Sequence, residues 1–240
     1  MYKKRQTIEK HFLDMVQRDE ERYLFSKWST IKEKSSRQMR YSYGNFPTFS
    51  DHDVSHSRNI LFALERLLGE EYIDNLSPSD SFLLLVCTYI HDIGMALSHD
   101  QLVETLKDSK FTHFLEKVQL KENLSELITF VNNMNNERLG EENNFGNAYH
   151  SICLLIQDFL RRDHFIVPDE WDILLSELLN PRHKQLVKDI CEAHGKEREC
   201  IDDLPILTTG FVNDDCHPKL IAALLRIGDL LDIDNGRFPT

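Results

Sequence analysis

The sequence predicts an all-α protein. Glycine and proline are scarce, with nine Gly and seven Pro among 240 residues, and helix-forming Leu, Glu, Lys, Ala and Gln are plentiful. Apolar residues recur at helical spacing along most of the chain. Neither a repeat nor an obvious linker is visible. We therefore expect one compact helical domain over residues 45–240, preceded by a helical segment over residues 1–44.

The first half of the chain is expected to hold three helical regions. They are one long or two short helices over residues 6–40, an amphipathic helix over 54–68 that ends near Gly69, and a helix that starts after Leu76 and runs to Ile93, with an ordered loop over 41–53. Ser77 can cap the third helix, Pro78 suits its first position, and Asp80 can close a capping box. This helix is the most apolar of the chain, so we expect it at the centre of the fold.

The second half continues the helical pattern. We expect helices over residues 100–106 (capped by Ser98), 111–134 (one or two), 148–162, 169–179 and 181–193, an exposed loop over 132–147, an irregular stretch over 200–215 with a short strand pair, and a last helix from Pro218 past Leu230. The chain stops soon after this helix, so we expect it to be a piece of a longer protein.

Charge and cysteine content narrow the class of partner. The net charge is −12, yet residues 1–40 hold 11 Lys or Arg against 6 Asp or Glu, a local +5. An acidic remainder argues against broad contact with duplex nucleic acid, which needs a basic face. The basic segment is a solvated helix face or a contact for an acidic partner. The five Cys are scattered and form no C-x-x-C pair, and no signal peptide is visible, which indicates a cytoplasmic protein. No apolar run is long enough to span a membrane, so we expect no membrane segment.

The strongest chemical signal is the pair His91-Asp92 at the end of the apolar helix. Two polar groups beside a buried helix are costly unless they are bound or paired. A structural His–Asp hydrogen bond is one explanation and a metal site is the other. Helical settings also hold four further candidates, His56, His150, His194 and Asp229. Mixed nitrogen and oxygen ligands suit Mn, Fe, Ni, Co, Mg or Zn.

The order His56 … His91-Asp92 … Asp229 resembles the H…HD…D signature of the HD-domain superfamily of metal-dependent phosphohydrolases. Three stretches around these residues are similar to the HD-CE type: DHDVSHS over residues 51–57, HDIGM over 91–95 and LRIGDLLD over 225–232. Domains of the HD-CE type are often fused to modules such as heat-shock-type ATPase domains. The resemblance covers roughly residues 45–235.

The resemblance implies a helical bundle whose metal ligands line one pocket. His56, His91, Asp92 and Asp229 would bind a first divalent ion, and Asp92 would bridge to a second one. His150 and His194 are the candidates for that second ion, so one or two ions are expected. Each of these two histidines is otherwise an ordinary core or surface residue.

The implied activity is phosphohydrolysis of a nucleotide-like phosphoester or phosphoanhydride by metal-activated water, with His91 and Asp92 as catalytic residues. His52, Arg58 and Arg226 are candidates for contacts with the small-molecule substrate, although a loop-ordering histidine and solvated arginines are the ordinary alternatives. Met95 stands where HD-type cyclic-dinucleotide phosphodiesterases have Lys. The paired His-His of that group and the His-rich motif of the triphosphohydrolases are absent.

Two other functions stay open. The domain could be a sensor that binds a nucleotide or metal and signals to a fused or partner ATPase domain, or a metal-dependent nuclease. The acidic composition counts against the nuclease. A homo-oligomer is compatible with everything in the sequence.

Overall fold

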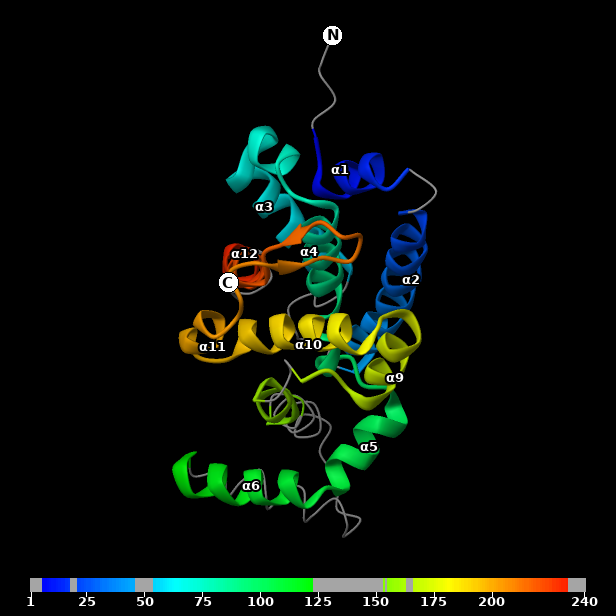
Figure 1. Cartoon of the computed structure of the whole chain (residues 1–240). Coiled ribbons are helices and arrows are strands. Elements are labelled where there is room, and N and C mark those ends of the chain that lie inside the picture. The colour runs from blue at the N-terminus through cyan, green and yellow to red at the C-terminus, as the bar shows by residue number, and fades with distance from the viewer. Residues whose placement is uncertain are drawn as a thin grey trace.

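The computed structural model describes residues 6–17, 21–45, 54–122, 153, 155–162 and 166–232. Within these ranges the chain is mostly helical, as predicted, and forms a helical bundle with one small β-hairpin (Figure 1). The elements in chain order are α1 (Ile8–Met15), α2 (Arg22–Asn45), α3 (Val54–Asp74), α4 (Pro78–Ile90), the 3-10 helix η1 (Ile93–Met95), α5 (His99–Lys107), α6 (Ser109–Glu122), α9 (Asp169–Leu178), α10 (Pro181–Gly195), α11 (Arg198–Asp202), β1 (Thr208–Thr209), β2 (Asp215–Cys216) and α12 (Pro218–Leu231).

Helix α4 forms the centre of the bundle, as its apolar sequence predicts. Every residue from 79 to 90 is buried. The helices α1, α2, α3, α10 and α12 all pack against it, and Figure 1 shows α4 enclosed by them. A smaller apolar cluster around Phe111 and Phe114 joins α6 to the segment that contains Cys153. The division into an N-terminal segment (residues 1–44) and a domain (residues 45–240) stays a prediction. In the structure, α1 and α2 pack against α4 and belong to the same hydrophobic core.

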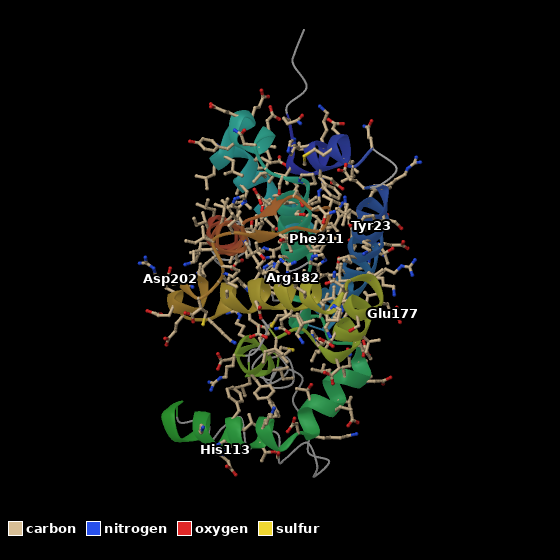
Figure 2. The ribbon with its side chains drawn as sticks, viewed as in Figure 1. Tyr23, His113, Glu177, Arg182, Asp202 and Phe211 are labelled. Atoms are coloured by element: carbon tan, nitrogen blue, oxygen red, sulfur yellow. The ribbon has the colours of Figure 1, made fainter. Side chains whose placement is uncertain are left out.

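The start of α4 is fixed by the hairpin and by the residue before α12. Ser77 caps the helix as predicted. The capping box predicted at Asp80 is wrong, because this carboxylate instead accepts hydrogen bonds from the backbone and ring of His217, at 2.7 and 2.8 Å. Hairpin residue Phe211 packs on Phe82, and its carbonyl accepts a hydrogen bond from Tyr23 of α2 (Figure 2). These contacts fix where α12 begins relative to α4.

Several helix boundaries differ from the sequence prediction. The N-terminal region is two helices, one of the two predicted arrangements, but α2 continues to Asn45, into the predicted loop over 41–53. The short helix α11 overlaps the start of the stretch over 200–215 that was predicted to be irregular. Helix α3 continues to Asp74 across a kink at Gly69, whose φ of +72° is easy only for glycine. Helix α4 ends at Ile90 instead of Ile93, because Asp92 leaves helical geometry at φ −103°, ψ 13° and the 3-10 turn follows. In the described ranges no single helix is long and apolar enough to span a membrane; α4 with η1 passes that test only in combination with α5, across a 57° bend.

Candidate metal centre

The four residues predicted as ligands of one ion lie together in the core. His56 comes from the first turns of α3, His91 follows the last residue of α4, Asp92 is next to it, and Asp229 comes from α12. One ligand atom of each lies within 4.8 Å of all the others. His56, His91 and Asp92 are buried, and Asp229 has 28% of its side chain exposed. Three helices therefore deliver one compact donor set that is open to solvent on the Asp229 side.

The spacing of the donor atoms fits a single divalent ion. His56 Nε2 lies 3.2 Å from His91 Nε2 and 3.4 Å from Asp229 Oδ1. Asp92 Oδ2 lies 3.5 and 3.3 Å from the same two nitrogens, and His91 Nε2 lies 4.0 Å from Asp229 Oδ1. Metal–ligand bonds of about 2.1 Å at tetrahedral or octahedral angles separate neighbouring donors by roughly 3.0–3.4 Å. The residues present therefore fit a metal ion, which the buried group could bind.

The imidazoles of this region are held so that Nε2 is the ligand atom. His91 Nδ1 lies 3.0 Å from the Thr88 carbonyl, which can only accept, so Nδ1 carries the proton. His194 Nδ1 donates in the same way to the Cys191 carbonyl. His56 Nδ1 lies 2.5 Å from Asp232 Oδ2. A neutral imidazole that donates from Nδ1 presents a lone pair at Nε2, which is the form that binds a metal.

Carboxylates give the centre a strong preference for positive charge. Burial lowers the pKa of His56, but hydrogen bonds to Asp229, Asp232 and Asp92 outweigh burial and raise that pKa well above its usual value. Burial raises the pKa of Asp229, but the hydrogen bond from His56 and the nearby His91 outweigh it and lower the pKa. Three acidic groups in one partly buried place are costly without a compensating cation, so the same field that holds a proton on His56 favours a metal ion.

His194 lies directly beside the four-residue group. Its Nε2 is 3.5 Å from Asp92 Oδ1, and its ring stands edge-on to His91 with centroids 4.8 Å apart. Asp92 therefore turns one oxygen toward His56 and His91 and the other toward His194. This arrangement places α10 at the centre as a fourth contributing helix, although His194 does not belong to the compact donor set itself.

Comparison with known proteins gives the family. A family model described as HD-CE matches residues 46–240. The chain belongs to the HD-CE family. No curated protein and no solved structure matches it. The matched range includes every residue of the centre described above.

The other residues predicted for the site are not part of the four-residue donor set. Arg226 of α12 donates a hydrogen bond of 2.9 Å to the Lys196 carbonyl, two residues beyond His194, and so ties α12 to the end of α10. Arg58 is exposed and lines a separate cleft beside α3. His52 and His150 lie outside the described residues. Substrate contact by His52, Arg58 and Arg226, and metal binding by His150 and His194, stay predictions.

One functional residue is not among the ligands that the motif predicts. The Asp232 side chain is 8% exposed, and its carboxylate lies 2.5 Å from His56 Nδ1. It follows Asp229 by three residues, so both carboxylates face the same side of the helix end. That spacing is the signal that could have identified it. A carboxylate behind a ligand histidine fixes the ring and raises its basicity.

Proposed function

We propose that this HD-CE domain is a metal-dependent phosphohydrolase that acts on a phosphoester or phosphoanhydride of a nucleotide-like substrate. The observation that carries the proposal is the donor set: two buried imidazoles and two carboxylates within 4.8 Å of one another, with each ring held in the ligating tautomer. A divalent ion supplies charge that lowers the pKa of a water and offsets charge on phosphoryl oxygens. The opening at Asp229 gives a substrate access to this set.

The two oxygens of Asp92 suit a site for two ions. Asp92 Oδ2 faces His56 and His91, and Asp92 Oδ1 faces His194 Nε2 at 3.5 Å. We infer that Asp92 would contribute a ligand oxygen to each ion and that His194, with His150, would hold the second one. Elemental analysis of the purified protein tests this point: about two ions per chain supports the second site, and one ion that is unaffected by His194→Ala contradicts it.

Asp92 is the residue whose loss should be most damaging. Asp92→Ala should remove bound metal and reduce hydrolysis by at least about 10²-fold, because both predicted ions lose a ligand. The measurement is turnover of a panel of nucleotides by Mn-loaded protein, together with metal content and circular dichroism.

Asp100→Ala, on the exposed first turn of α5, is the matched control and should keep both metal and activity. An Asp92→Ala protein that retains full turnover without metal would overturn the proposal. Thermal stabilisation by nucleotides with no turnover, in metal-loaded wild type, would support the sensor instead.

A further inference from the structure

A second candidate site lies on the other side of α3 from the metal centre. A cleft of about 900 Å³ opens between α3, α4 and the N-terminal helices α1 and α2. Its volume lies at the upper end of the range of small-molecule pockets. Lys32, Arg58, Asn59, Phe62 and Tyr89 are among the side chains that line it.

The cleft and the metal centre use opposite faces of α3. Arg58, Asn59 and Phe62 are spaced by one, three and four residues, so they share one helix face, and all three line the cleft. Ile60 and Leu64 are fully buried on the opposite face, where they contact Gly228 of α12. His56 is four residues before Ile60 and belongs to that buried face. A ligand in the cleft would therefore not reach the metal ligands through α3.

Three hydrogen-bonding side chains of the cleft have no partner in the part of the chain that the structure describes. Tyr89 is only 3% exposed, yet its hydroxyl makes no hydrogen bond with any described residue. Arg58 and Asn59 likewise make no hydrogen bond or ion pair there. The Tyr89 phenol therefore lines the cleft with a hydroxyl that is unpaired within the described ranges, next to two other such polar side chains, and all three are available to a ligand bound there.

All three groups can donate hydrogen bonds, which is the chemistry that suits an oxyanion. The Tyr89 phenol offers one O–H donor to the cleft. The Arg58 guanidinium offers the planar fork that suits phosphate. Lys32 also lines the cleft, but it is paired with Glu9 at 2.5 Å.

Charge and shape limit the ligand further. Glu9 and Glu65 balance Lys32 and Arg58 in the lining, so a polyphosphate would meet little net attraction, whereas one phosphate group can be matched by Arg58. Phe62, with 53% of its surface exposed and the Arg66 guanidinium 5.8 Å from its ring centroid, adds an aromatic side chain to the lining, which suits a ligand with a planar ring. We propose that this cleft binds a ligand that joins a planar heterocycle to a single phosphate, of the nucleoside monophosphate class.

The test measures binding to metal-free protein by calorimetry in the presence of chelator, with AMP and GMP as probes. Binding should be detectable in the micromolar to millimolar range. Arg58→Ala should weaken it about 10- to 100-fold because a charge-assisted bond is lost, and Tyr89→Phe about 3- to 10-fold because a single hydroxyl is removed. Adenosine and inorganic phosphate should each bind at least about tenfold more weakly than AMP.

Two controls separate this cleft from the metal centre. Arg37→Ala removes an arginine of α2 that is 74% exposed and paired with Glu33, and it should leave AMP binding unchanged. Asp92→Asn should also leave it unchanged, which separates failure here from failure of the proposed phosphohydrolase. No AMP or GMP binding, binding insensitive to Arg58→Ala and Tyr89→Phe, or binding lost with Asp92→Asn overturns the inference. Equal affinity for ribose 5-phosphate overturns the part of it that concerns the planar ring.

Discussion

At the scale of single residues, the orientation of the histidine rings decides what the centre can do. Each ring has two nitrogens, and the protein uses Nδ1 of His56, His91 and His194 for hydrogen bonds to its own oxygens. Two of these acceptors are backbone carbonyls three residues earlier in the same helix. The third is Asp232, which comes from the far end of the sequence. The His56 ring therefore depends on a side chain that mutation can remove.

Asp232→Ala should weaken metal binding by about 10- to 100-fold, because His56 loses the partner that orients its ring and increases its basicity. Asp232→Asn keeps an acceptor without the charge and should lie between Ala and wild type. Calorimetric titration with Mn²⁺ measures the effect. Asp202→Asn, on an Asp that is 60% exposed in α11, is the control. Unchanged affinity in Asp232→Ala would show that His56 is oriented without it.

At the scale of helices, the close approach of α12 to α3 sets the distance between Asp229 and His56. Gly228 precedes Asp229, and a Cβ there would come within 2.8 Å of Ile60 Cγ2 and 3.0 Å of Leu64 Cγ. Both neighbours are fully buried. The two helices can be this close only because residue 228 has no side chain.

Gly228→Ala should therefore lower the free energy of unfolding by about 1–3 kcal/mol and weaken metal binding, because the added methyl forces α12 away from α3. Urea unfolding and Mn²⁺ titration measure the two effects. Leu230→Ala is the control on the same helix. Its side chain is 69% exposed, so its truncation should change the free energy of unfolding and the metal affinity much less. Equal stability of Gly228→Ala and wild type would mean that the core can repack around the methyl.

The pairing of α9 with α10 gives a pH-dependent contribution to stability. Hydrogen bonds from Lys184 and Lys188, at 2.8 and 2.6 Å, lower the pKa of Asp172. A carboxyl whose pKa is lower in the folded state stabilises the fold above its unfolded pKa of about 3.9, and this stability is lost as the pH falls through the folded pKa.

Asp172→Asn should cost roughly 0.5–1 kcal/mol at pH 7, a small value because these charges are partly solvated. Urea unfolding of variant and wild type should give curves that converge as the pH falls from 5 toward 3. Glu33→Gln, in an exposed pair with Arg37, is the control and should have a smaller effect. A deficit that persists undiminished at acid pH would show that lost packing, and not charge, is responsible.

Much of this architecture could be predicted from the sequence because the relevant signals are local. The apolar run from Phe82 to Ile90 predicted a central helix, and the cap at Ser77 predicted where it begins. The grouping of His56, His91, Asp92 and Asp229 came from a motif order and not from spacing, since nothing local brings residue 56 to residue 229. The structure confirms that they meet.

The parts that the sequence did not predict depend on distant partners. Asp80 looked like a capping residue, but His217 is its partner, 137 positions away. Asp232 was not predicted as a site residue, because its contact with His56 spans 176 positions. The cleft beside the Arg58 face of α3 depends on the packing of α1 and α2, which contribute to its lining. Hydrophobic periodicity in the sequence does not specify this packing.

At the scale of the whole molecule, a bound ion would connect distant parts of the chain. It would join α12 to α3 and α4, which lie much earlier in the sequence, so metal should bind the native state and not the unfolded chain. Mn²⁺ at about 100 times its Kd should stabilise the fold by about 2.7 kcal/mol. Differential scanning fluorimetry with and without chelator measures the shift, and a melting temperature insensitive to both would contradict metal binding by the native fold.

The long separation between His56 and Asp232 has a consequence for biosynthesis. While α12 is still being translated, the nascent chain already carries His56, His91 and Asp92 but lacks Asp229 and the carboxylate that orients His56. An ion captured at that stage would be held by an incomplete set of ligands. Docking of α12 would then complete the donor set and supply the carboxylate that orients His56.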